Sequence, residues 1–156
     1  MTQTPAADAR RASPEDSFND RTGHLIKRAE QHLISEKSHV LRAVDLTVPQ
    51  YVALLVLHRR PGLSGAQLAR ECMVTAQTMT TVLNNLESKG LITRTTSQVH
   101  QKVLVSSLTR SGRSLFKKAD KLICSVEGRL DDAFSEEERQ QLHSLLERAI
   151  AALRSD

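Results

Sequence analysis

The chain has 156 residues, of which 39% are hydrophobic, 26% charged and 3% aromatic, with a formal net charge of +4. Its length suits one domain with helical extensions, and so few aromatic rings argue against an all-β sandwich and favour a core of aliphatic helices. The chain has no apolar run long enough to span a membrane, no apolar signal-peptide core and only two cysteines, so we expect a cytoplasmic protein with no membrane partner and no disulfide framework.

The first third of the chain predicts a tail and two helices. Residues 1–17 are polar and rich in Pro and Ala, which is typical of a disordered tail. From Phe18 to Val44 apolar residues recur at helical spacing, which predicts one long amphipathic helix. Thr47 then caps a second helix, whose run from Tyr51 to Leu57 is apolar on nearly all sides and should be buried. This helix ends before Arg60-Pro61-Gly62.

Two helix starts follow in quick succession. Ser64 is a cap for a short helix through Arg70, and Thr75 is a cap for a longer one that ends at Lys89. Gly90 comes next, at a position where a residue with positive φ commonly ends a helix. A short helix, a brief turn and a second helix form the helix-turn-helix pattern of DNA-binding proteins.

After Gly90 the apolar period changes from helical to alternating. The segments Leu91–Thr95 and Val103–Leu108 predict two short strands of a β-hairpin, and the polar segment Thr96–Lys102 predicts its projecting loop. A hairpin directly after the second helix is typical of a winged helix-turn-helix. Thr109 then caps a long helix through Leu130, and Ser135 caps a final helix through Leu153. The predicted fold class is therefore mainly α with a small β-hairpin wing.

The helix after Thr75 carries an unusual polar face. Opposite its apolar stripe of Met79, Val82, Leu83 and Leu86 stand Thr, Asn and Gln, which are weaker helix formers than the Glu and Lys of ordinary solvated helices. Such side chains suit base edges in the major groove, where Asn or Gln can pair with adenine, although a plain surface helix of weak composition is the alternative. The predicted DNA contacts in this region are Ser64, Thr75, Ala76, Gln77, Thr78, Thr80, Thr81, Asn84 and Asn85.

Basic residues are concentrated in one segment. No acidic residue lies between Glu87 and Asp120, whereas the end of the chain is acidic. A basic run is often only a solvated surface, but beside a helix-turn-helix it predicts contacts with DNA phosphates. We expect these contacts from Arg94, Lys102 and Arg110, with Gln98 and His100 also reaching DNA from the hairpin loop.

An ordered set of motifs resembles the MarR family of bacterial transcriptional regulators. These motifs are Leu46–Tyr51, Pro61–Ala69, Val74–Thr80, Leu86–Ile92 and Leu108–Gly112, and the resemblance spans roughly residues 20–153. It implies a homodimer in which residues 18–46 and 109–156 form a helical dimerisation domain and residues 47–108 form the winged helix-turn-helix. It further implies binding to double-stranded DNA at a pseudo-palindromic operator, usually as a repressor that a small ligand releases. Phe18, Tyr51 and Leu55 are our candidates for the ligand pocket.

The predicted wing departs from the family pattern. Relatives often carry an Asp-x-Arg element whose arginine enters the minor groove, whereas residues Ser97 to Lys102 contain neither Asp nor Arg. Lys102 or His100 would then serve the minor groove, and lysine suits a narrow groove less well than arginine. The missing arginine supports one alternative, a winged-helix adaptor for other proteins with weak or lost DNA binding.

Other functions find less support. The chain has no Gly-rich phosphate loop and no evident nucleophile–base pair, so we expect neither an enzyme nor a cofactor. His24, His32 and His39 share one helix face, but ligands two turns apart on one helix cannot hold the same ion, and a polar stripe at a dimer interface is the simpler interpretation. Cys72 is interpreted as a small buried hydrophobe, and a redox role for Cys124 has no support in the sequence.

Overall fold

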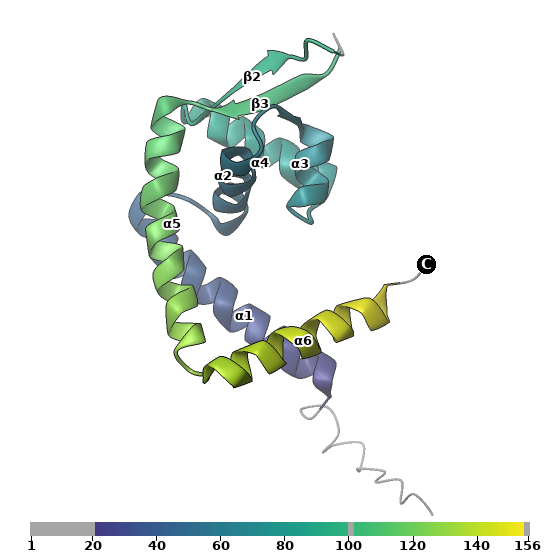
Figure 1. The fold of residues 1–156 in the computed structure, drawn as a ribbon. Helices are drawn as coiled ribbons and strands as arrows, with labels where there is room; N and C mark the ends of the chain where they lie inside the picture. Colours follow the sequence, from purple (N-terminus) through teal and green to yellow (C-terminus); the bar gives the residue numbers. More distant parts are fainter. Residues whose placement is uncertain (1–20, 100–101, 155–156) are drawn as a thin grey trace, which may run out of the picture. The chain divides into compact units, whose positions relative to one another are not determined.

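The computed structural model describes residues 21–99 and 102–154, which are mainly helical (Figure 1). The chain falls into two units, one ending at Ser35 and the other beginning at Glu36. The elements are α1 (Thr22–Leu41), a 3₁₀ turn η1 (Arg42–Val44), α2 (Val48–Arg59), β1 (Leu63–Ser64), α3 (Gly65–Glu71), α4 (Ala76–Ser88), β2 (Ile92–Thr96), β3 (Leu104–Leu108), α5 (Arg110–Asp131) and α6 (Glu136–Leu153). The predicted fold class, mainly helical with a small wing, is confirmed.

The first unit contains the larger part of α1. Its side chains are mostly exposed, and Lys27 forms an ion pair with Glu30 one turn further along, at 2.7 Å. Leu25, Ile26 and Ile34 are exposed apolar residues on this helix. Phe18, which was predicted to belong to both this helix and a ligand pocket, lies outside the described residues.

Local side-chain hydrogen bonds fix where the helices of the second unit begin. The Oγ1 of Thr47 accepts from the N–H of Gln50 at 3.3 Å, and the Gln50 side chain accepts from the Thr47 N–H at 3.0 Å. Ser64 and Gln67 repeat this capping box at α3, and Ser135 and Glu138 repeat it at α6. The five predicted caps, Thr47, Ser64, Thr75, Thr109 and Ser135, are confirmed.

Helix α2 lies at the centre of the second unit and packs against α5, α4 and β3. Ala53, Leu54 and Leu57 of this helix are almost completely buried. The prediction that the whole run from Tyr51 to Leu57 is buried is confirmed only in part, because Val52, Leu55 and Val56 are half-buried. The fully buried residues around them come from several elements: Leu41, Leu68, Met79, Leu86, Ile92 and Ser106. One aliphatic core therefore holds the helix-turn-helix, the sheet and α5 together.

No single helix in the described residues is long and apolar enough to cross a membrane. The bent pair Thr22–Val44 and Val48–Arg59 meets that criterion only jointly, by length and composition, and α2 belongs to the core described above.

The sheet has three antiparallel strands in the order β1-β3-β2, with Leu63 opposite Ser106 and Ile92 opposite Leu108. The expectation of a two-stranded hairpin was therefore incomplete, because β1 adds a third strand before α3. Two residues are too short to show alternation, and β1 is recognisable only from its backbone pairing, which the hydrogen bond from Gly62 N–H to Ser106 O (2.9 Å) extends. In Figure 1 the hairpin of β2 and β3 lies over α3 and α4 and runs away from the start of α5.

The beginning of α5 is fastened to the turn that follows α4. The Oγ1 of Thr109 donates to the carbonyl of Gly90 at 2.7 Å, and its N–H donates to the carbonyl of Leu91 at 3.0 Å. Gly112 lies so near this turn that a Cβ atom there would stand 1.9 Å from the Leu91 carbonyl oxygen. Only glycine fits at this position, because the atom that a side chain would meet belongs to the backbone.

We expect Gly112→Ala to lower the free energy of unfolding by about 3 kcal/mol or more, because the backbone of the turn must shift to admit the methyl group. Gly128→Ala is the matched control, since nothing lies within 4 Å of a Cβ at that position of the same helix. It should leave stability unchanged or raise it by up to about 1 kcal/mol. Urea unfolding followed by circular dichroism measures both, and equal stabilities of the two variants would contradict the close contact.

Candidate nucleic-acid interface

Helix α4 separates its residues into a buried and an exposed face. Met79, Val82, Leu83 and Leu86 are buried, as the apolar stripe predicts. Every residue of this helix that is predicted to contact DNA is exposed: Ala76, Gln77, Thr78, Thr80, Thr81, Asn84 and Asn85, together with the cap Thr75. Ser64, the cap of α3, is half-buried. The structure therefore brings the predicted contact residues of α4 together on one accessible surface, which we call the recognition face.

The hydroxyls of two threonines on the recognition face donate to carbonyls of their own helix. Thr80 Oγ1 donates to the carbonyl of Ala76 at 2.9 Å, and Thr81 Oγ1 donates to the carbonyl of Gln77 at 3.3 Å. Their hydroxyl protons are used in this way, so these residues offer methyl groups and acceptor lone pairs to the outside. A methyl group in the major groove suits the 5-methyl group of thymine.

The first turn of α4 has the features of an anion-binding helix N-terminus. Thr75 Oγ1 accepts from the Thr78 N–H at 3.1 Å and lies 2.9 Å from the Thr78 hydroxyl. The other N–H groups of a first helical turn have no partner inside the helix, and with the helix dipole they favour a phosphate.

The turn between α3 and α4 is closed by a Schellman motif. The N–H of Val74 donates to the carbonyl of Ala69 at 3.0 Å, and the N–H of Met73 donates to that of Arg70 at 3.1 Å. Met73 therefore takes a left-handed conformation (φ 53°) that usually belongs to glycine, and its side chain is 91% exposed. The same motif ends α4, where Gly90 (φ 68°) occupies the equivalent position as predicted.

The wing and the start of α5 carry the other predicted contacts. Ser97 N–H donates to the carbonyl of Val103 at 2.7 Å and closes the base of the loop. Gln98 and Lys102 are exposed near this closure, and Arg110 is exposed at the first position of α5. His100 lies outside the described residues.

Arg94 has a more internal position than its predicted role suggests. It extends from β2 to α4, where its Nε donates to Glu87 Oε2 at 2.8 Å and its Nη2 donates both to the same carboxylate and to Asn84 Oδ1, the latter at 2.9 Å. The hydrogen bond from Arg94 holds the pKa of Glu87 below its usual value. Sequence spacing gives no sign of this cluster, because it joins a strand to a helix face.

Lys89, another residue of the basic run, is also engaged. Its Nζ donates to the backbone carbonyl of Asp45 at 2.6 Å and to the Asp45 carboxylate at 2.8 Å. This contact ties the end of α4 to the segment that precedes α2.

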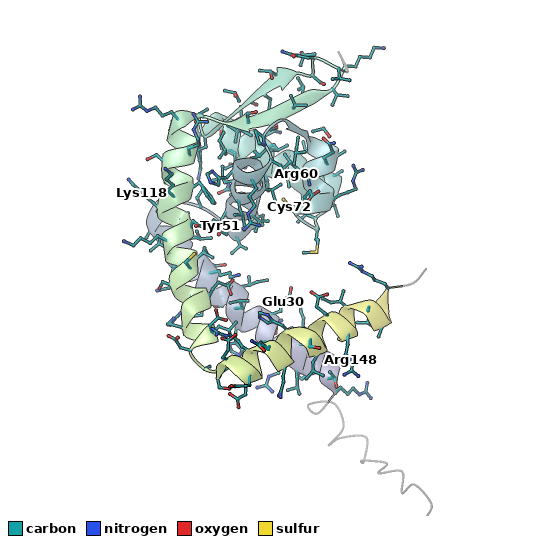
Figure 2. All side chains as sticks on the ribbon, in the orientation of Figure 1. Glu30, Tyr51, Arg60, Cys72, Lys118 and Arg148 are labelled. Atoms are coloured by element: carbon teal, nitrogen blue, oxygen red, sulfur yellow. The ribbon has the colours of Figure 1, made fainter. Side chains whose placement is uncertain are left out.

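The two described candidates for a ligand pocket lie on α2. Tyr51, which is labelled in Figure 2, is buried. Its hydroxyl donates to Asp120 Oδ1 on α5 at 2.8 Å, and its ring stacks on Phe116 at 6.1 Å. Burial, followed by this hydrogen bond, raises the pKa of Tyr51. His58 stacks on the same phenylalanine at 4.6 Å, and Leu55 is half-buried against the core.

The cysteines and histidines form no cluster in the part of the chain that the structure describes. Cys72 is half-buried at the end of α3, where burial raises the pKa of its thiol, and Cys124 is exposed on α5. No group of three residues with metal-binding side chains occurs within residues 21–99 and 102–154.

Comparisons with known proteins identify relatives that match most of this chain. A family model described as "MarR family" matches residues 44–102. The HTH-type transcriptional repressor Rv2887 of Mycobacterium tuberculosis is 35% identical over 126 residues, which cover 81% of this chain and 91% of that protein. The homoprotocatechuate degradative operon repressor of Escherichia coli is 27% identical over 126 residues, with coverage of 81% and 85%.

Solved structures of such regulators also match most of this chain. A CouR repressor bound to a DNA duplex is 28% identical with a TM-score of 0.78, and the match covers 85% of this chain and 94% of that one. The Rv2887 protein in complex with DNA is 32% identical with a TM-score of 0.67 and coverage of 83% and 97%. A complex of the same protein with salicylic acid is 34% identical with a TM-score of 0.66 and coverage of 83% and 96%.

We expect Met73→Gly to raise the free energy of unfolding by about 0.5–1 kcal/mol. The left-handed conformation costs an L-residue about 1–2 kcal/mol, and part of the gain is offset by the greater freedom of glycine in the unfolded chain. The Met73 side chain is exposed, so its removal sacrifices little burial. Gly90→Ala is the reverse substitution at the equivalent position and should destabilise by about 1 kcal/mol. Thermal unfolding compares them, and a loss of stability in Met73→Gly would contradict this account.

Proposed function

Because the chain belongs to the MarR family and is a DNA-binding transcriptional regulator, we propose that it acts as a repressor in the bacterial cytoplasm, bound as a homodimer to a pseudo-palindromic operator. The observation that carries the residue assignments is the recognition face of α4, where Thr, Asn and Gln stand exposed opposite a fully buried apolar stripe. The DNA-bound relatives favour this function over an adaptor role, which rests on the composition of the wing alone. Its mode of action is binding and not catalysis.

The apolar surface of α6 supports a homodimer. This 18-residue helix has no buried residue, although Leu145, Leu146, Ile150 and Leu153 lie along it. Exposed apolar stripes of this kind mark association surfaces. We therefore assign dimerisation to residues 18–46 and 109–156 and DNA recognition to residues 47–108.

A two-fold dimer places its two recognition helices in successive major grooves, about 34–36 Å apart. On each half-site, Gln77, Thr78, Thr80, Thr81, Asn84 and Asn85 face the bases, and Thr75 with Ala76 presents the first turn of α4 to a phosphate. Ser64, Lys102 and Arg110 contact the DNA backbone, and Gln98 and His100 approach it from the wing. Lysine and arginine contacts of this kind displace counterions and so make affinity depend on salt.

A small aromatic acid is our proposed effector class. Structures of the Rv2887 relative hold salicylic acid and p-aminosalicylic acid at 34% identity to this chain. Phe18, Tyr51 and Leu55 are the proposed pocket residues. The Tyr51–Asp120 hydrogen bond joins the winged helix-turn-helix to α5. A ligand that binds beside this hydrogen bond can therefore alter how the winged helix-turn-helix is connected to α5.

Asn84→Ala should lower affinity for an operator about tenfold while changing affinity for a scrambled duplex less than about twofold, because a base contact carries sequence information. Lys102→Ala should weaken binding to both duplexes equally and reduce the slope of log affinity against log salt by about 1, because one phosphate is no longer neutralised. Salt-titrated fluorescence anisotropy on a duplex selected by the wild-type protein from a randomised library measures both. Equal reductions on the two duplexes for Asn84→Ala would remove the base-contact assignment.

Salicylate should weaken operator binding by about 5–150-fold, the range of typical allosteric coupling. The control is salicylamide, which keeps the ring and hydroxyl but lacks the carboxylate, and it should have a much smaller effect. Anisotropy titrations at constant ionic strength separate the specific effect from screening. Identical curves with and without salicylate and simple benzoates would exclude this effector class.

A further inference from the structure

Arg94 connects the wing to the recognition face through two partners on α4. Its side chain is only 23% exposed, and its guanidinium lies between the Glu87 carboxylate and the Asn84 amide. Asn84 and Glu87 are three residues apart, so they are neighbours on the surface of the helix. Glu87 holds the guanidinium, and the guanidinium in turn holds the side chain of Asn84.

This arrangement determines which atoms Asn84 presents to DNA. A guanidinium can only donate hydrogen bonds, so the amide atom that faces it must be the oxygen. The Oδ1 of Asn84 is then occupied by Arg94 at 2.9 Å, and the Nδ2 group carries the donors that remain. Bidentate pairing with adenine requires an amide donor and an amide acceptor together, and in this orientation Arg94 already takes one of the two lone pairs of the Asn84 oxygen, which makes that oxygen a poorer partner for the adenine N6 amino group.

The same cluster reduces the suitability of Arg94 as a phosphate contact. Its charge is balanced by Glu87, which receives hydrogen bonds from both Nε and Nη2. Moving the guanidinium to a phosphate would leave the Glu87 carboxylate without these partners beside a negatively charged duplex.

We propose that Arg94 is a positioning residue for base recognition, which holds Asn84 with its amide donors outward so that Asn84 selects guanine or thymine and not adenine. Guanine offers two neighbouring acceptors in the major groove, O6 and N7, and thymine offers O4, whereas adenine offers N7 beside an N6 amino group that can only donate. This inference rests on the proposed function, in which α4 enters the major groove, and it replaces both the phosphate contact predicted for Arg94 and the adenine pairing predicted for Asn84.

Arg94→Lys is the decisive variant, because it keeps the positive charge but removes the fork that reaches two acceptors. We expect the ratio of affinities for selected and scrambled duplexes to fall about tenfold, with the salt slope unchanged. A phosphate contact predicts the opposite, since lysine preserves it and the ratio would stay constant. Thermal unfolding of each variant shows that the fold is retained.

A double-mutant cycle provides a second measurement. Arg94→Met and Asn84→Ala are made singly and together in a Glu87→Gln background. The background substitution is needed because the loss of Arg94 would otherwise leave the Glu87 carboxylate without its partner. If Arg94 acts through Asn84, the combined variant discriminates sequences no worse than Asn84→Ala alone. Additive effects on discrimination, or a salt slope reduced by about 1 in Arg94→Met, overturn the inference.

The selected sequences test the direction of the amide. At the base position whose preference disappears in Asn84→Ala, the wild-type protein should prefer guanine or thymine, and a preference for adenine overturns the inference while leaving the proposed function intact. If the wild-type protein selects no sequence at all from the randomised library, the proposed function itself fails, and this inference fails with it.

Discussion

The backbone turn at Gly90 and Leu91 is the point on which the DNA-binding part of the molecule depends. It ends α4 through a Schellman motif, begins β2, and accepts two hydrogen bonds from Thr109 at the start of α5. Gly112 touches the same turn so closely that no side chain fits there. The recognition helix, the wing and the long helix that follows are therefore held at one junction, and a movement of α5 reaches α4 and the wing through rigid contacts.

This junction lets α4 tolerate a sequence that is poor for a helix. Threonine and asparagine occupy most of its exposed positions, and several of their side chains bond back to the helix carbonyls instead of supporting it by charge. Its stability comes from elsewhere: the Thr75 cap, the Gly90 terminus and the burial of Met79 and Leu86. The exposed residues of α4 are therefore not needed for helix stability, and their types can be those that suit the recognition of DNA.

The features predicted from the sequence are those with local causes. Capping residues and apolar periodicity act within a few positions, so the five caps and the buried stripe of α4 followed directly from the residue order. Strand β1 could not be predicted, since two residues have no period and are defined by their partner Ser106. Met73 in a left-handed conformation was also unexpected, because the turn dictates that conformation against the residue's own preference. The Arg94 cluster depends on where β2 passes α4, which no spacing rule reveals.

The distribution of charge separates affinity from specificity. Two cations of the segment between Glu87 and Asp120 form ion pairs, Lys89 with Asp45 and Arg94 with Glu87. The recognition face itself therefore adds little net charge. The exposed cations Lys102 and Arg110 stand beyond it, on the wing and at the start of α5. In the proposed complex, long-range attraction to DNA comes from the elements around α4, while α4 meets the bases with neutral donors, acceptors and methyl groups whose energies depend on geometry and only weakly on salt. The proposed effector would act on both at once if it shifts α5, because Arg110 and the Gly90–Leu91 turn are attached to the same end of this helix.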